Sequence, residues 1–177
     1  WQNLHLFYTH GYGVVVSPAA RVTEQGLPEF WVRDIPPEAT SGLEITRPEI
    51  YYGQQTDTYS IVNTTTREFD YPSGDENVYT SYEGSTGVKV GSFLRRLVFA
   101  LHLDDFRILF TGEIQPDSRV LLRRNIEERA RRIAPFLLFD RDPYVVIRDD
   151  GSLSWIHDAY TISRRYPYSE VVTGGVR

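Results

Sequence analysis

Histidine and tyrosine alternate near the start of the chain, at Tyr8, His10 and Tyr12. Phenol and imidazole groups donate, accept and transfer protons, so such a row could bind a ligand or shuttle a proton. If the segment is a strand, the three side chains share one face, because side chains alternate along a strand. A hydrogen-bonded structural row is the expected role, and a ligand-facing row is the alternative.

A second imidazole stands directly before a carboxylate, at His157 and Asp158. Neighbouring strand residues point to opposite faces, so these two side chains are not expected to pair with each other. A hydrolytic triad would also need a serine placed by the fold, and the sequence has no G-x-S-x-G motif. P-loop, G-x-G-x-x-G and H-E-x-x-H motifs are absent as well. The sequence therefore names no catalytic residue, and both side chains stay candidate ligand-facing groups.

Acidic loops offer oxygen atoms to a hard cation such as calcium. Asp140 and Asp142 lie two positions apart, and Asp75 precedes Glu76 and Asn77. Calcium takes about six to eight oxygen ligands, and none of these segments has the EF-hand pattern. Turn chemistry, in which Asp and Asn side chains bond to nearby backbone, is the expected role. We therefore expect no cofactor, with calcium at these residues as the weaker alternative.

Composition limits the classes of function. The net charge of −5 argues against nucleic-acid binding, which needs a basic surface. The absence of cysteine excludes disulfides, thiolate metal sites and cysteine nucleophiles. The longest strongly apolar run, residues 97–103, is far shorter than the ~20 residues of a membrane-spanning helix. Methionine is absent even at position 1, so we expect residues 1–177 to be a single soluble domain excised from a larger protein.

Short strands are expected in the first half of the chain, where aromatic and β-branched residues gather between turn residues. The expected strands are Leu4–Val16, which glycines interrupt, and residues 30–32, 49–52, 59–62 and 67–71. Residues 53–57 would be the hairpin connection between the third and fourth of these strands, and residues 72–77 a turn.

Helical spacing appears in the second half. Val90, Leu94, Leu97, Val98 and Leu101 form one apolar stripe, which predicts an amphipathic helix. A second helix is expected to begin near Ser118 and to end at Pro135. Its buried stripe would be Leu122, Ile126, Ala130 and Ile133, with ion pairs four residues apart on its outer face. Arginines in the segment 119–132 could meet an anionic partner such as lipid headgroups, but the interleaved glutamates favour a solvated, ion-paired face.

Two strands close the pattern, Tyr144–Arg148 and Leu153–Ala159. Asp149-Asp150-Gly151 joins them, and Asp-Gly is a strong hairpin signal. The tail from Ser163 is polar and irregular. The whole pattern predicts an α+β fold, with a mostly antiparallel sheet and two main amphipathic helices packed on it.

Nine segments resemble the uncharacterised protein family 0182 of bacterial membrane proteins, in the family's order along nearly the whole chain. They are Tyr8–Val15, Leu27–Phe30, Arg33–Pro37, Thr46–Gly53, Phe69–Gly74, Arg124–Ile126, Ala134–Leu137, Asp142–Tyr144 and Trp155–Thr161. The resemblance implies a large polytopic protein, common in actinobacteria and cyanobacteria, with N-terminal membrane helices and a long region outside the cytoplasmic membrane. This chain would be part of that region. The family carries no established activity, so no site residue can be transferred.

The resemblance and the missing catalytic motifs together favour a non-catalytic interaction or sensing domain on the extracytoplasmic side of the cell membrane. Its partners would be the remainder of its own protein, a second copy, or a component of the cell envelope. The alternative is a cell-envelope hydrolase that uses His10, His157 or paired aspartates in a cleft. If neighbouring segments are missing, the chain should self-associate or expose a sizeable apolar face.

Overall fold

The computed structural model of the chain describes residues 1–40 and 42–163. The helices are η1 (Asn3–Phe7, a π-helix), α1 (Phe93–His102), α2 (Arg107–Phe110) and α3 (Ile126–Ile133). The strands of the first half are β1 (Gly11–Tyr12), β2 (Val32–Arg33), β3 (Glu38–Ala39), β4 (Glu49–Ile50), β5 (Ser60–Val62), β6 (Glu68–Ser73), β7 (Glu76–Thr80) and β8 (Val88–Lys89). Those of the second half are β9 (Arg119–Leu121), β10 (Leu138–Phe139), β11 (Tyr144–Ile147), β12 (Leu153–Ile156) and β13 (Ala159–Tyr160).

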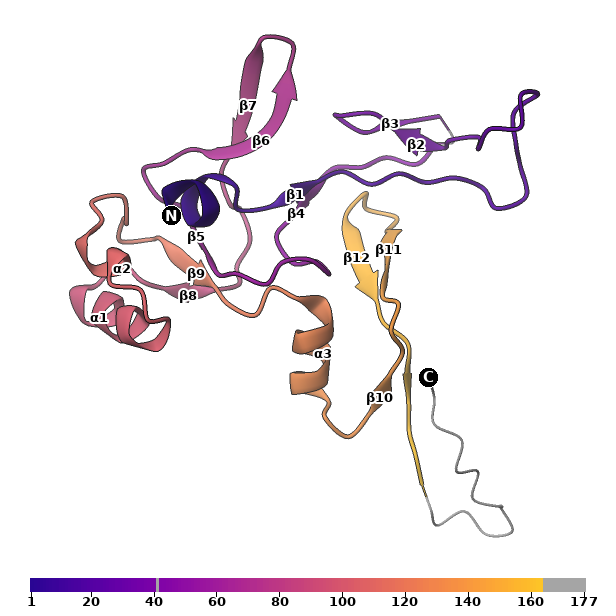
Figure 1. Ribbon diagram of the computed structural model, residues 1–177. Helices are drawn as coiled ribbons and strands as arrows, with labels where there is room; N and C mark the ends of the chain where they lie inside the picture. Colours follow the sequence, from indigo (N-terminus) through magenta and orange to yellow (C-terminus); the bar gives the residue numbers. More distant parts are fainter. Residues whose placement is uncertain (41, 164–177) are drawn as a thin grey trace.

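The core lies at one end of the molecule, where η1, α1 and α2 surround a three-stranded sheet in the order β5-β9-β8 (Figure 1). Each residue of β5 is buried, so protein covers both faces of this strand, and its side chains do not alternate between buried and exposed. The main cluster of buried apolar side chains is Leu6, Ile61, Val90, Phe99, Ala100, Ile108, Ile114 and Val120. Few side chains of the remaining elements enter this cluster.

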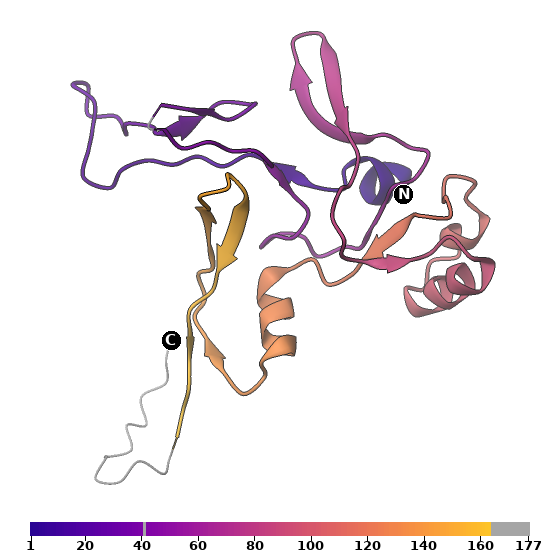
Figure 2. The ribbon, with the colours of Figure 1, turned by 180° about the vertical axis from the view of Figure 1, so that it is seen from behind.

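Three arms extend from the core (Figure 2). Residues 11–40 and 42–50 form the first arm, in which β1 pairs with β4 and β2 pairs with β3. The β6–β7 hairpin forms the second arm, and its turn contains Gly74 at a φ of 60°. The third arm contains α3, the β11–β12 hairpin and the β10–β13 pair. The arms leave a large surface for a chain of this length.

The α+β prediction is confirmed, and every pairing between the named strands is antiparallel. The strands are divided among several small sheets rather than one continuous sheet. The predicted hairpin at Gly151 is found, with Tyr144 opposite Ile156 and Ile147 opposite Leu153. The turn predicted over residues 72–77 is shorter, because residues 72–73 belong to β6 and residues 76–77 to its partner β7. The tail beyond Ser163 lies outside the described residues.

The N-terminal prediction of a strand over Leu4–Val16 is wrong for most of its length. A π-helix occupies Asn3–Phe7, and only Gly11–Tyr12 is a strand. The reason is tertiary packing: the helix turns Leu6 fully into the core and stacks the His5 ring on Tyr59 at 4.0 Å between ring centroids. A strand would have pointed these neighbours to opposite faces.

The connection expected over residues 53–57 is not a hairpin. β4 pairs with β1, and β5 pairs with β9, so the two strands on either side belong to different sheets. Gly53 instead pairs with the chain entering α3: its N–H donates to the Arg124 carbonyl at 3.1 Å, and its carbonyl accepts from the Ile126 N–H at 3.1 Å. Gly53 therefore pairs with a segment more than seventy residues away, and the local pairing of β4 with β5 does not form.

The second helix begins later than the spacing predicted. Residues 119–121 form β9, and α3 starts at Ile126 with Asn125 as its cap, whose side chain accepts from the Glu128 N–H at 3.2 Å. Ser118 is buried, donates to the Asn63 carbonyl and fixes the turn into β9, so it caps no helix. The end of the helix before Pro135 is confirmed, but none of its side chains is buried.

The first helix is confirmed, yet most of its predicted apolar stripe faces outward. Val90 precedes α1 and is buried in the core, and Leu97 is half-buried, but the other three residues are exposed. Phe99 and Ala100 are the residues of α1 that enter the core. Leu94, Val98 and Leu101 are 69%, 56% and 62% exposed, and Phe93 beside them is 70% exposed. Across the described residues, exposed large apolar side chains outnumber the buried ones. The expected exposed apolar face is thus confirmed.

Within the described part of the chain, no helix is long and apolar enough to span a bilayer.

Candidate functional site

Tyr8, His10 and Tyr12 do not form one row along a strand, because the chain is a strand at only the last of them. All three nevertheless face strand β6. Tyr8 meets the edge of Phe69 at 5.5 Å between ring centroids, and Tyr12 lies 4.8 Å from the ring of Tyr71. Burial, followed by the charge of Asp70, raises the pKa of Tyr12 to about 12.

His10 lies in a buried polar network rather than on an open surface. Its side chain is fully buried, with Nε2 3.2 Å from Asp70 Oδ1 and Nδ1 3.0 Å from the hydroxyl of Thr9. That hydroxyl donates to Glu68 Oε2 at 2.6 Å, as does the phenol of Tyr51 at 3.0 Å. Burial and the adjacent Glu68 hold the pKa of Tyr51 well above its ordinary value, so its phenol remains a donor. The structural role expected for His10 fits this network.

The donors of this network can be counted. Thr9 has one hydroxyl hydrogen and gives it to Glu68, so its oxygen can only accept from His10 Nδ1. His10 Nε2 faces an acceptor in Asp70. The imidazole therefore stands between two carboxylates of β6, reaching Asp70 directly and Glu68 through the Thr9 hydroxyl.

Arg124 closes the network from the other side. It is buried, and it donates to the Thr9 carbonyl, to the Ser60 hydroxyl and, at 2.8 Å, to the Tyr51 carbonyl. Burial lowers the pKa of Arg124, and nearby tyrosines and Glu68 partly offset that effect. Its hydrogen bonds tie the N-terminal segment to β5 and to the end of β4.

His157 and Asp158 lie in the third arm, and no contact joins their side chains. The carbonyl of Asp158 accepts from the Asp140 N–H at 3.0 Å, while Nε2 of His157 bonds to the Asp140 carbonyl at 2.7 Å. The imidazole also packs on Phe139, with 4.9 Å between ring centroids. These bonds extend the β10–β13 pairing, and they bring His157 to Asp140 through backbone rather than through a carboxylate.

The candidate calcium residues do not come together. Asp75 is in the β6–β7 turn of the second arm, whereas Asp140 and Asp142 follow β10 in the third arm. The Asp140 carboxylate accepts from the Arg141 N–H at 2.7 Å, as expected for a turn. No group of three acidic or imidazole side chains in the described residues is arranged to hold a metal ion. The expectation of no cofactor, with calcium as the weaker alternative, stays a prediction.

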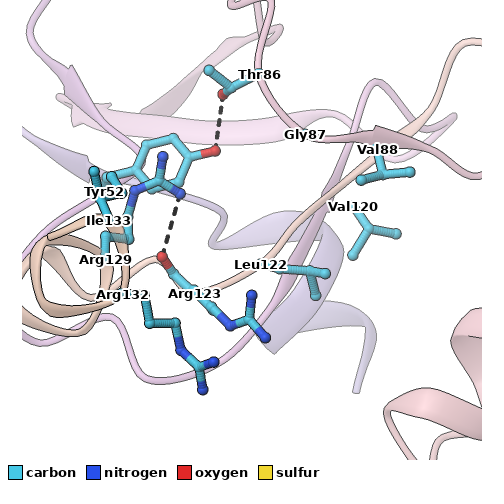
Figure 3. A pocket seen from close by; sticks show the side chains of 10 residues that line it. All are labelled: Tyr52, Thr86, Gly87, Val88, Val120, Leu122, Arg123, Arg129, Arg132 and Ile133. Carbon is cyan, nitrogen blue, oxygen red and sulfur yellow. Dashed lines mark hydrogen bonds between the residues drawn. The ribbon is translucent and has the colours of Figure 1, made fainter. Parts of the chain in front are cut away.

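A cavity of about 340 Å³ opens where α3 faces the β8–β9 edge of the core sheet. Figure 3 shows Tyr52 and the arginine side chains on one side of this cavity, with Val88, Val120 and Leu122 on the other. Its lining residues are Tyr52, Thr86, Gly87, Val88, Val120, Leu122, Arg123, Arg129, Arg132 and Ile133. Neither predicted histidine is among them.

Sequence reasoning placed some of these arginines differently. Arg123 and Arg124 precede α3, so their expected helical pairs with glutamates four residues later do not form. The pairs Arg131–Glu127 and Arg132–Glu128 do form, at 3.7 and 3.0 Å. Glu128 also lies 3.7 Å from Arg123 Nε, so one carboxylate serves two guanidinium groups.

A neighbouring cavity of about 350 Å³ gathers imidazoles and carboxylates that were not singled out in the sequence. It is lined by His5, Asp57, Thr58, Tyr59, His102, Leu103, Leu122, Arg123 and Glu128. His5 bonds through Nδ1 to the Tyr59 carbonyl at 2.8 Å, and burial lowers its pKa. Spacing along the chain carried no signal for this grouping, because its members come from distant segments.

Comparison with known proteins identifies the family. The model of the uncharacterised protein family UPF0182 matches residues 1–176. A UPF0182 protein of Desulforamulus reducens is 56% identical over 170 residues, which is 96% of this chain and 18% of the relative. A UPF0182 protein of Methanospirillum hungatei is 56% identical over 176 residues, or 99% of this chain and 19% of the relative. A third, from Clostridium botulinum, is 48% identical over 174 residues.

These relatives show how long the family's proteins are and in which organisms they occur. The chain spans about a fifth of the length of the curated relatives it matches. They come from diverse bacteria and an archaeon, so the expected restriction to bacteria is too narrow. No solved structure matches the chain. The chain belongs to the uncharacterised protein family UPF0182.

Proposed function

We propose that this chain is a non-catalytic packing and interaction domain within a larger membrane protein, on the extracytoplasmic side. Its main partner is the remainder of its own polypeptide. The observation that carries this proposal is the α1 helix, which is apolar on two faces while only one of them meets the core. An exposed apolar helix face that the core leaves uncovered marks a surface that packs against another protein surface.

The relatives supply the partner. They are about five times longer than this chain, so most of their polypeptide lies outside it. Phe93, Leu94, Val98 and Leu101 form the outer face of α1, and we refer to them as the α1 face. The packed helix α2 adds Phe110, which is 81% exposed. Large exposed apolar side chains gathered on one helix face mark an interaction site.

The hydrolase alternative is not supported as a second function. It required an imidazole and a carboxylate converging in a cleft. His10 and Asp70 do converge, but the His10 side chain is fully buried and its nitrogens bond to Thr9 and Asp70. The cavity beside α3 is lined by neither histidine nor carboxylate. The neighbouring cavity has both, but His5 Nδ1 bonds there to the Tyr59 carbonyl, and among these described residues no hydrogen bond joins an imidazole to Asp57 or Glu128.

Charge placed on the α1 face tests the packing role. In the full-length protein, Leu94→Glu with Val98→Glu should make this region more sensitive to limited proteolysis in membranes, because the partner surface can no longer cover α1. In the 177-residue chain the same pair should leave the melting temperature nearly unchanged, since both side chains are exposed there. Gln55→Glu, at another exposed position, is the matched control.

Two results would contradict the packing role. One is unchanged protease resistance of the full-length double variant, and the other is an equal loss of stability in the short chain. The membrane side is tested separately by Ser73→Cys at the exposed β6–β7 turn, in a full-length protein stripped of other cysteines. A membrane-impermeant maleimide should label it in intact cells. Labelling only after lysis would place the domain on the cytoplasmic side.

A further inference from the structure

We propose that the cavity between α3 and the β8–β9 edge binds an anionic amphiphile, meaning a carboxylate or phosphate group attached to an apolar chain. We call it the arginine cavity, and it is lined by the residues given above. Nothing in the packing role requires it. The proposal rests on three features: apolar side chains left bare, a surplus of guanidinium charge, and a prearranged arginine.

Apolar side chains lie on both sides of the cavity, with Val88, Val120 and Leu122 on the β8–β9 side and Ile133 on the α3 side (Figure 3). Val120 is fully buried, whereas Val88 is 48% exposed and Ile133 is 77% exposed. These side chains lie on the cavity, so part of their exposed surface is offered to an occupant. An acyl chain covering Val88 and Ile133 would gain from removing that surface from water.

The charged side of the cavity has more cations than anions. Arg123 and Arg132 share the single carboxylate of Glu128, and Arg129 forms no ion pair within the described residues. This surplus stands out in a chain whose net charge is −5. Guanidinium groups suit carboxylates and phosphates because their N–H groups match two acceptor oxygens at once.

Arg129 is held in place before any ligand arrives. Its guanidinium lies over the Tyr52 ring, 4.3 Å from the centroid, and donates to the Arg123 carbonyl at 3.5 Å (Figure 3). Tyr52 in turn is fixed through its hydroxyl, 2.8 Å from Thr86 Oγ1. A fixed cation loses little side-chain freedom on binding, so it favours affinity.

The volume and the two chemistries together select the ligand class. About 340 Å³ is at the small end of pockets that hold organic ligands. A bare inorganic anion would leave Val88 and Ile133 uncovered, and a neutral apolar molecule would leave the guanidinium groups without an acceptor. An amphiphile with one anionic end satisfies both.

Isothermal titration of the 177-residue chain with decyl phosphate, below its critical micelle concentration, tests the proposal. Inorganic phosphate and neutral decyl maltoside are the comparison ligands. We expect decyl phosphate to bind at least about tenfold more tightly than either, because each lacks one of the two interactions. Equal binding of inorganic phosphate would reduce the cavity to a simple anion site. Equal binding of the maltoside, or no binding at all, would overturn the proposal.

Matched variants locate the site. Arg129→Gln should weaken decyl phosphate binding on the order of tenfold through the lost charge-assisted bond. Arg131→Gln is the control, because Arg131 is on the same helix and pairs with Glu127 outside the cavity. Ile133→Ser should weaken decyl phosphate binding but leave inorganic phosphate unaffected. Equal effects of Arg129→Gln and Arg131→Gln would show that binding follows overall charge, and the arginine cavity would be refuted.

Discussion

At the scale of single residues, Asp105 joins the first residue of the chain to the α1–α2 turn. Its carboxylate accepts from the Trp1 indole at 2.7 Å, from the Tyr59 hydroxyl at 2.6 Å and from Arg107 Nε at 2.8 Å. Burial alone would raise the pKa of Asp105, but these hydrogen bonds outweigh it and hold the pKa well below its ordinary value. The folded chain thus keeps Asp105 ionised in acid that protonates it in the unfolded chain.

The sign of this shift predicts an acid-dependent stability. The contribution of Asp105 is present above the ordinary carboxyl pKa of about 3.9 and is lost as the pH falls toward its lowered folded value. Asp105→Asn should therefore lower the urea midpoint at neutral pH, and its gap from the parent chain should narrow between about pH 5 and pH 3. Asp75→Asn, in the exposed β6–β7 turn, is the control. A gap that stays constant with pH would contradict this role.

Arg124 gives a second prediction at this scale. Its guanidinium bonds to three groups from separate segments, the carbonyls of Thr9 and Tyr51 and the hydroxyl of Ser60. A lysine keeps the charge but cannot reproduce the planar fork, so Arg124→Lys should lower the free energy of unfolding by about 2–3 kcal/mol. Arg131→Lys on the exposed face of α3 should change it by less than about 0.5 kcal/mol. Chemical denaturation of both variants measures the difference, and similar losses would argue against the buried network.

At the scale of elements, three turn and loop glycines differ in whether a side chain there would meet backbone strain, a close neighbour, or neither. Gly151 has a φ of 76°, and a Cβ added there would lie 2.8 Å from the Glu44 carbonyl oxygen. Gly74 has a φ of 60° with open space, and Gly112 has neither strain nor a close neighbour. Alanine should therefore cost little at Gly112, about 1 kcal/mol at Gly74 and more at Gly151. Thermal melts of the three variants check this order, and an equal cost at Gly74 and Gly151 would contradict the close packing of the β11–β12 turn.

Local patterns predicted the elements whose partners are near in sequence. Asp-Gly predicted the β11–β12 hairpin. Turn residues over 72–77 predicted a change of direction there, and the tight turn at Gly74 joins β6 to β7, a strand that the pattern did not predict. The spacing of residues 90–101 predicted a helix, and Pro135 marked the end of α3. Elements with distant partners were misassigned. Leu6 lies in a π-helix that packs on β5, where a strand was predicted. Residues 119–121 form β9 between β5 and β8, where the apolar spacing predicted the start of the second helix.

The candidate site shows the same limit. The network around His10 depends on Glu68 and Arg124, which are 58 and 114 positions away in the chain, and nothing in their local spacing connects them. The arginine cavity depends on Arg129 meeting Tyr52. The sequence identified the arginine-rich segment and favoured a solvated face for it. It could not show which group each arginine meets, because tertiary contacts decide that.

At the scale of the whole molecule, the chain exposes large apolar side chains to water. The α1 face and Phe110 are exposed here, while relatives are about five times longer. In the 177-residue chain these side chains have no cover from the described residues, so apolar contact between copies should drive concentration-dependent self-association.

Sedimentation velocity over a range of concentrations should show this association, and Leu94→Glu with Val98→Glu should shift the chain toward monomer. The effect should be specific to α1, because charge there opposes the burial of the same face in a second copy. Tyr160→Glu, at a residue of the third arm that is 56% exposed, is the matched change outside that face. If Tyr160→Glu disperses the chain as well as the α1 pair does, association is spread over the arms, and the α1 face is not the principal contact surface.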